Sequence, residues 1–222
     1  MVRAPGRRFA RKAPSKFDKS RSVDIRVTDM VANDAAWWDA RLGAKHALIR
    51  SRADRLWSWS VLLPMCHLVQ LVKRRHCRSL VIWARDDRGR FLRVGMSIFI
   101  ESYPYLDVTR SLESNFVWFV SAADPALLRS DFGMSQPPAL GRVLLDNAII
   151  LSQNAGVEGR IGLHAAAAGG RVLLNIYIAC GLSRLAASAT LPPGVKRKND
   201  GRFFFADEVR AEAMAAMLDA SR

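Results

Sequence analysis

The chain has 222 residues and half of them are apolar, which is enough for one packed core and excludes a chain that is disordered throughout. Its three cysteines form no disulfide framework, so we expect a reducing compartment and a cytoplasmic protein. The formal charge of +14 indicates an attraction to phosphate groups or to acidic surfaces.

The positive charge is concentrated in two segments. Residues 1–26 contain nine Lys or Arg against two Asp, and residues 73–93 contain eight against two. Because residues 1–21 are rich in Arg, Lys, Pro and Ser, we expect a flexible basic arm there, followed by a single domain over 22–222. The two segments either bind nucleic acid, a ribonucleoprotein or an acidic protein, or they are a solvated tail and an ordinary surface.

The first half of the chain predicts both strands and helices. In chain order, the expected elements are a strand at 23–27, a helix capped by Asn33 or Asp34 and ending at Gly43, a second helix from about 48 to 75, and strands at 80–84 and 91–100. Apolar residues alternate in the first strand, which is typical of a strand with one buried face. The last two strands are joined by a turn at 86–89 and form an antiparallel pair.

The second half predicts the rest of a mixed sheet. The expected elements are a strand at 116–120, a long loop at 123–135, a helix at 140–155, a strand at 160–163, a helix at 172–180, strands at 185–189 and 202–206, and a helix from Asp207. This order predicts an α/β (α+β) fold with a mixed, mostly antiparallel central sheet flanked by helices.

Neither a membrane span nor a metal site is expected. The most hydrophobic run, residues 56–72, is short and is interrupted by Ser, Pro, His and Gln. Cys66-His67 and His76-Cys77 lack the paired short spacings of a zinc site. The tryptophan-rich helices and apolar strands allow a homodimer.

The segment Gln136-Pro137-Pro138-Ala139-Leu140-Gly141-Arg142 opens the helix at 140–155 in the manner of a phosphate-binding loop. A helix N-terminus offers unpaired amides and the positive end of a dipole to an anion. A second motif, Tyr177-Ile178-Ala179-Cys180-Gly181-Leu182, ends the next helix. An alternative interpretation of the first motif is that its two prolines only start a helix.

With these motifs, the order of elements over 23–206 resembles the GNAT superfamily of acyl-coenzyme A-dependent N-acyltransferases. In that family the loop reads Gln or Arg, two variable residues, Gly, one variable residue, then Gly or Ala. Here Ala139 stands at the first glycine position, and Pro137 and Pro138 have no N–H to donate.

The resemblance implies an N-acyltransferase, most simply an acetyltransferase, that transfers an acetyl group from acetyl-coenzyme A to an amine by direct attack. It implies that pantetheine runs along a strand and that the pyrophosphate sits at the helix start. The implied coenzyme-binding residues are Val120, Ser121, Gln136, Ala139, Leu140, Gly141 and Arg142. The donors left for the pyrophosphate are the four amides from Ala139 to Arg142 and the Arg142 side chain.

Acyl transfer to an amine needs a base for the amine and an acid for the departing thiolate. Tyr177 matches the family's acid position, and its alternative interpretation is a core tyrosine. For the base we favour Glu101, at the end of the strand at 91–100, with Glu113 and His164 in reserve. A solvated surface carboxylate is the alternative for Glu101.

The acidic residues between 101 and 113 hint at a cationic amine as acceptor. The alternative function is a non-catalytic GNAT-like protein that binds nucleic acid or an acidic protein partner through its basic arm and basic patch.

Overall fold

The structure is a computed structural model that describes residues 8–50, 52–73, 75–107, 109, 111–195 and 197–222. Its centre is an eight-stranded sheet with the strand order β1-β2-β3-β4-β5-β6-β8-β7. The strands are β1 (Lys12–Pro14), β2 (Ser22–Asp29), β3 (Cys77–Arg85), β4 (Phe91–Pro104), β5 (Glu113–Ala122), β6 (Ile161–His164), β7 (Ser183–Arg184) and β8 (Phe203–Ala206).

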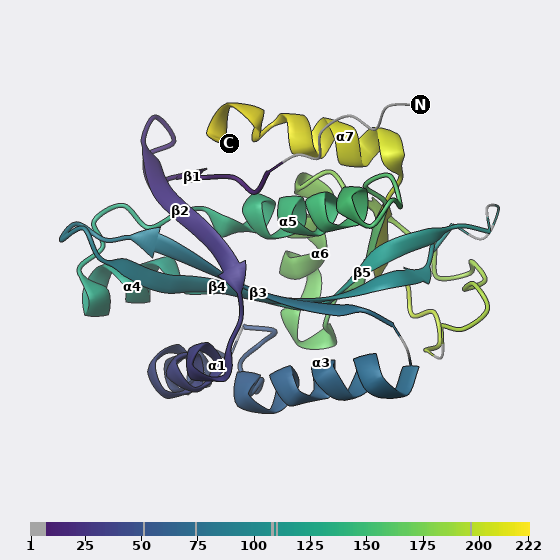
Figure 1. Ribbon diagram of the computed structural model, residues 1–222, viewed down its shortest axis with the longest axis horizontal. Helices are drawn as coiled ribbons and strands as arrows, with labels where there is room; N and C mark the ends of the chain where they lie inside the picture. The colour runs from purple at the N-terminus through teal and green to yellow at the C-terminus, as the bar shows by residue number, and fades with distance from the viewer. Residues whose placement is uncertain (1–7, 51, 74, 108, 110, 196) are drawn as a thin grey trace.

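Helices cover both faces of this sheet (Figure 1). They are α1 (Ala32–Trp38), α2 (Ala44–His46), α3 (Trp59–Lys73), α4 (Pro125–Phe132), α5 (Leu140–Asn154), α6 (Gly170–Ala179) and α7 (Glu208–Ala216), with short helical segments at Asp39–Gly43, Ala167–Gly169 and Asp219–Ser221. In Figure 1, α5 and α7 lie on one side of the sheet, and α1 and α3 lie on the other. The predicted mixed α/β architecture is confirmed.

The sheet is antiparallel except between β5 and β6. These two strands pair in parallel from Asn115 with Ile161 to Val117 with Leu163. Beyond Val117, β5 continues to Ala122, while β6 ends at His164. The first half of β5 therefore pairs with most of β6, and the two strands separate beyond Val117.

The predicted helix at 140–155 is the element that the sequence located best. It is found as α5, which lies against β5 and is buried on all sides from residue 143 to residue 152, including Val143, Leu144 and Ala148. The antiparallel pair β3–β4 is also as predicted, and Gly89 takes a positive φ of 78° in the turn between its strands. Asp207 caps the last helix by accepting a hydrogen bond from the Arg210 amide, as expected.

The expected loop at 123–135 is wrong, because most of it is the helix α4. The Asp124 side chain accepts hydrogen bonds from the amides of Ala126 and Leu127, at 2.8 and 3.3 Å, and Pro125 occupies the first turn. Gly133 ends the helix with a φ of 64°. These are ordinary helix start and stop signals, and the helix is short because they lie close together.

Three other expected boundaries are corrected. The second helix begins only at Trp59, where Asp39 accepts hydrogen bonds from the amides of Trp59 and Ser60 at 2.8 and 2.9 Å. The first helix begins at Ala32, after Val31, and the Asp34 carboxylate accepts from the Val31 amide instead of starting the helix. The strand expected at 185–189 is replaced by the two-residue β7.

The expected flexible arm is corrected for residues 8–21, whereas residues 1–7 lie outside the described residues. Strand β1 pairs with β2, and Ala10 and Ala13 are buried in the main core. The Arg11 amide donates to the Ser221 carbonyl at 2.7 Å. Lys12 is exposed, whereas Ala10 and Ala13 are buried. This segment is therefore an edge strand with a small apolar face, although its composition is basic.

Within the described part of the chain, no helix has the length and apolar character needed to cross a membrane. The same residues contain no group of three or more His, Cys, Asp or Glu side chains that could hold a metal ion.

Candidate active site

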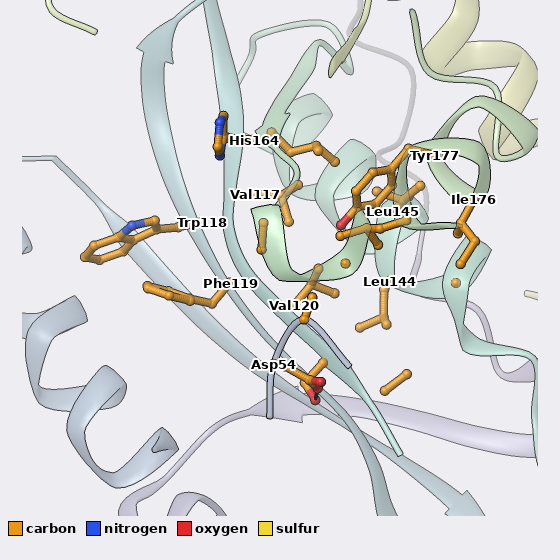
Figure 2. Close-up of a pocket in the computed structure, with 18 of the residues that line it drawn as sticks. Asp54, Val117, Trp118, Phe119, Val120, Leu144, Leu145, His164, Ile176 and Tyr177 are labelled. Carbon is orange, nitrogen blue, oxygen red and sulfur yellow. Dashed lines mark hydrogen bonds between the residues drawn. The ribbon is translucent and has the colours of Figure 1, made fainter. Parts of the chain in front are cut away.

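A large cavity opens where β5 and β6 separate. Its volume is about 1420 Å³, which exceeds the range of about 300 to 1,000 Å³ typical of drug-sized ligands. One wall is formed by residues 116–122 of β5 and by Ala123, which follows it. The start of α5 forms a second wall, and α6 forms a third. Figure 2 shows side chains from these elements converging on the same space. The cavity can therefore hold one long ligand together with a small second one.

Five of the seven expected coenzyme-binding residues line this cavity. They are Val120, Ser121, Ala139, Leu140 and Gly141. The first two lie on β5 beyond the point where it leaves β6, and the other three form the start of α5. The geometry thus brings together the strand and the helix start, which are far apart in the sequence.

The loop before α5 is held by the N-terminal strand. The Pro14 carbonyl accepts a hydrogen bond from the Ala139 amide, and the Lys16 amide donates to the Pro137 carbonyl, both at 2.8 Å. The expected set of four phosphate-binding amides is therefore reduced to three, because the Ala139 amide is already used. Ala139 provides no side-chain cap, which leaves the amides of Leu140, Gly141 and Arg142 at the helix start.

Lys16 adds a cation at this helix start. Its side chain is exposed and lines the cavity together with Pro138 and Ala139. The hydrogen bond between Ser15 Oγ and Gln136 Oε1, at 2.7 Å, fixes the same segment from the other side. A basic residue from the N-terminal segment therefore lies where the sequence pattern expects phosphate.

Two of the expected residues, Gln136 and Arg142, do not line the cavity. Gln136 is engaged with Ser15. Arg142 is exposed on α5, and its charge lowers the pKa of the Cys180 thiol, while burial outweighs this effect and raises that pKa. Arg142 can contribute its backbone amide and its positive field, but a direct side-chain contact with a ligand is not part of the observed geometry.

The carboxylates favoured by the sequence also lie elsewhere. Glu101 is absent from the cavity lining, its amide donates to the His76 carbonyl at 2.8 Å, and its charge acts on the Cys77 thiol. Glu113 borders a separate, smaller pocket with Arg75 and Ser102. Neither carboxylate is placed to take a proton inside the main cavity.

Tyr177 enters the cavity from α6. Figure 2 shows its hydroxyl group directed into the space between His164 and Leu145. Burial, supported by Cys180 and the Asp54 charge, raises the pKa of Tyr177 to about 12. The phenol therefore stays protonated at neutral pH and can donate a hydrogen bond. Its ring packs on Phe204, with the centroids 5.5 Å apart.

His164 lies at the end of β6 on another side of the cavity (Figure 2). Its Nε2 lies 3.0 and 3.1 Å from the two carboxylate oxygens of Asp200, which indicates that Nε2 carries the proton. Its Nδ1 is then unprotonated and accepts a hydrogen bond from Arg197 Nη1 at 2.5 Å. Burial is the main cause that lowers the pKa of His164 below 6.5, so the imidazole is neutral at neutral pH.

A buried polar cluster surrounds Asp54 at the far end of the view from His164 (Figure 2). Arg52 binds the Asp54 carboxylate through Nε and Nη2, at 2.9 and 2.7 Å, and Ser121 Oγ donates to the same carboxylate. Burial favours a higher pKa for Asp54, but Arg52 and Ser121 outweigh it and lower that pKa. Asp54 is therefore a poor proton acceptor and ties the turn before α3 to the end of β5.

His46 completes this cluster. It is buried, its Nε2 accepts from the Asp124 amide at 3.4 Å, and its Nδ1 lies 3.8 Å from Asp54. Burial and the positive charge of Arg52 lower the pKa of His46 to about 4. Sequence reasoning missed this cluster and Lys16. The available signals were a histidine next to a lysine and a lysine two residues after a proline, and both are common in other settings.

The separation of β5 from β6, the start of α5 at the opening and the tyrosine from α6 agree with the GNAT-like fold that the sequence led us to expect. A comparison with protein-family models finds no match, and a comparison with curated proteins finds none either. Several solved structures are similar in fold.

One of these structures is spermidine N-acetyltransferase from Vibrio cholerae in complex with CoA and spermine, with 13% identity, coverage of 85% of this chain and 98% of that chain, and a TM-score of 0.47. A second is a GNAT superfamily phosphinothricin acetyltransferase from Sinorhizobium meliloti in complex with acetyl-CoA, with 14% identity, coverage of 82% and 87%, and a TM-score of 0.44. A third is a mutant AtaT toxin bound to the C-terminus of the antitoxin AtaR, with 12% identity, coverage of 86% and 96%, and a TM-score of 0.48. At these values the likeness is one of general fold.

Proposed function

We propose that the protein is an N-acetyltransferase that transfers the acetyl group of acetyl-coenzyme A to an amine. The observation that carries this proposal is one cavity that joins the start of α5 to Tyr177 and His164. Such a cavity offers an anion site at one end, a hydrogen-bond donor in the middle and a proton acceptor on the wall of β6. These are the three functions that acyl transfer from a phosphorylated thioester to an amine requires.

The coenzyme end is supported by three amides and one cation. The amides of Leu140, Gly141 and Arg142 and the Lys16 ammonium group would hold the pyrophosphate, because helix dipole and charge both favour an anion there. The backbone of Val120 and Ser121 would run beside the pantetheine arm. The cavity volume is sufficient for this long ligand.

The proposed proton transfers follow from the neutral imidazole of His164 and the protonated hydroxyl group of Tyr177. The nitrogen of a neutral amine forms a bond to the acetyl carbon, and Nδ1 of His164 takes the proton that this nitrogen loses. The carbon–sulfur bond breaks, and the Tyr177 hydroxyl donates a hydrogen bond to the departing sulfur. Because the pKa of Tyr177, about 12, lies above the ordinary thiol value of about 8.5, this hydroxyl stabilises the thiolate and keeps its proton.

His164 replaces Glu101 as the proposed base. His164 lines the cavity and has an oriented imidazole, whereas Glu101 lies outside the lining. Asp200 would hold the ring in the tautomer that leaves Nδ1 free and would stabilise the imidazolium that forms.

The alternative of a non-catalytic binding protein rested on the basic arm and the basic patch at 73–93, on the altered loop before α5 and on the lack of a clear base. Residues 8–16 of that arm pack against the sheet, the loop before α5 and Ser221 near the C-terminus, and His164 supplies a candidate base. We therefore do not propose nucleic-acid binding as the function.

The proposal is tested by release of the coenzyme thiol from acetyl-coenzyme A in the presence of a mixture of primary amines. The expected result is amine-dependent thiol release that falls at least about a hundredfold in His164→Asn. The matched control is His67→Gln, an exposed histidine on α3. Equal rates with and without amines, or an unaffected His164→Asn variant, would count against the proposal.

A further inference from the structure

The wall of the cavity beside His164 carries two cations, Arg197 and Lys198, and one carboxylate, Asp200, so its net charge is positive. Arg197 and Lys198 both line it and both are exposed. The two carboxylates that line the same cavity are engaged elsewhere, since Asp200 pairs with His164 and Asp54 pairs with Arg52. Among the described residues, neither Arg197 nor Lys198 forms an ion pair with an acid.

Arg197 also occupies the position that the proposed base needs. Its Nη1 donates to His164 Nδ1 at 2.5 Å, and Asp200 holds the other ring nitrogen. The only free lone pair of the imidazole is thus covered by a guanidinium group. A proton acceptor blocked in this way becomes available only when Arg197 finds a better partner.

We propose that the acceptor is a small amine that carries an anionic oxygen group, a carboxylate or a phosphate, and that Arg197 binds this group. The inference rests on the proposed acetyltransferase function and names its substrate class. A guanidinium binds a carboxylate or phosphate through two charge-assisted hydrogen bonds, which are stronger than one bond to a neutral imidazole. Binding of the acceptor therefore draws Arg197 away and uncovers Nδ1 next to the incoming amine.

The step then balances without another reactant. The amine nitrogen bonds to the acetyl carbon, the carbon–sulfur bond breaks, and the sulfur leaves as a thiolate that accepts a hydrogen bond from Tyr177. The proton lost by the nitrogen moves to His164 Nδ1, and Asp200 accepts a hydrogen bond from the resulting imidazolium. The products are an N-acetylated anion and free coenzyme.

The rest of this wall suits the same class of acceptor. Phe116 and Trp118 line it from β5, and Tyr103 lines it from β4, so the body of the acceptor meets aromatic rings. The acidic residues that hinted at a cationic amine do not contribute, because Glu101, Asp107 and Glu113 are outside the cavity lining. A polyamine would place its positive charges against Arg197 and Lys198.

Matched pairs of acceptors test the inference. Phenylalanine is compared with phenylalaninamide, and O-phosphoethanolamine with ethanolamine, with spermidine as the cationic probe. We expect kcat/KM to be at least about tenfold higher for the member with the carboxylate or phosphate in one pair, and the pair that responds identifies which of these anions Arg197 binds. Equal use of both members in both pairs, or a preference for spermidine, would overturn the inference.

The variant Arg197→Gln should remove this preference by raising KM for the anionic acceptor at least about tenfold, while KM for acetyl-coenzyme A stays unchanged. Arg88→Gln, an exposed arginine in the turn between β3 and β4, is the matched control and should keep the preference. A preference that survives in Arg197→Gln would contradict the role of Arg197.

A binding measurement gives a readout that does not need turnover. N-acetylphenylalanine and its amide are titrated into the protein, and the imidazole signal of His164 is followed by NMR. If the anion is a carboxylate, the acid should shift this signal and the amide should not, because only the acid displaces Arg197; identical responses here, together with equal use of both members of each acceptor pair, would overturn the inference. Failure of the proposed function is distinguishable, since it would appear as absence of acetyl-coenzyme A binding.

Discussion

The Pro14 carbonyl and the Ala139 amide are joined by a hydrogen bond of 2.8 Å, which ties the first strand to the loop that opens α5. This bond removes one amide from the phosphate-binding set and at the same time fixes the N-terminal segment that carries Lys16 beside the helix start. The N-terminal segment is thereby part of the proposed coenzyme site. In the proposed site, Lys16 of this segment contributes a positive charge for the pyrophosphate.

Lys16→Gln should weaken binding of coenzyme A about five- to tenfold, because one charge-assisted contact to phosphate is lost. Binding of acetylpantetheine, which has no pyrophosphate, should not change. Lys12→Gln is the control, since Lys12 is exposed in the same N-terminal segment and lies outside the cavity lining. Calorimetric titration measures the affinity of each variant for the two ligands. An equal loss of affinity for coenzyme A and for acetylpantetheine in Lys16→Gln would indicate a structural effect instead.

Tyr177→Phe should lower kcat about ten- to a hundredfold and leave the Kd of acetyl-coenzyme A unchanged, because the hydroxyl acts on the departing sulfur. The pKa of Tyr177, about 12, further predicts that kcat has no alkaline decline from this group below about pH 10. A variant with the wild-type kcat would contradict the proposed role.

The pH dependence of kcat/KM should report the imidazole of His164. Burial, together with the charges of Arg197 and Arg202, lowers the pKa of His164 below 6.5, so the fall in activity that His164 causes should appear only as the pH drops below that value, separate from the effect of protonating the amine. The Asp200 carboxylate opposes this effect and raises the pKa. In Asp200→Asn the acidic limb should therefore move to lower pH, with a lower maximum rate, whereas a move to higher pH would contradict the assignment.

Stability should depend on pH through His46. Its pKa is lowered from 6.5 to about 4 by burial and by Arg52, so the folded state binds fewer protons than the unfolded state between these values. The free energy of unfolding should then be highest above pH 6.5 and should fall, by on the order of 3 kcal/mol, as the pH drops toward 4.

Urea unfolding at several pH values measures this dependence. His46→Gln should flatten the curve over that range, and the exposed His67→Gln should not change its slope. A curve that stays equally steep in His46→Gln would show that another group binds the proton.

The sequence predicted those elements whose signals are local. The apolar spacing in α5, the alternation in β2 and the turn at Gly89 each depend on a few neighbouring residues, and all three are found. The helix α4 carried equally local signals in Asp124, Pro125 and Gly133, but it has only eight residues and was interpreted as a loop.

The candidate site was predicted only in part, because only some of its residues belong to local sequence motifs. Tyr177 and the start of α5 are recognisable within short motifs, whereas the contact between Lys16 and the loop at 136–139 joins segments about 120 residues apart. The pairing of His164 with Asp200, and the cluster around Asp54, also depend on tertiary contacts. No spacing in a single sequence indicates which histidine or carboxylate faces a shared cavity.

The cavity between β5, α5 and α6 is the proposed binding site of acetyl-coenzyme A. Calorimetric titration of the full chain with acetyl-coenzyme A measures this binding directly. We expect saturable binding at one site, weakened in Lys16→Gln and unchanged in Lys12→Gln. No detectable binding at millimolar acetyl-coenzyme A would contradict it.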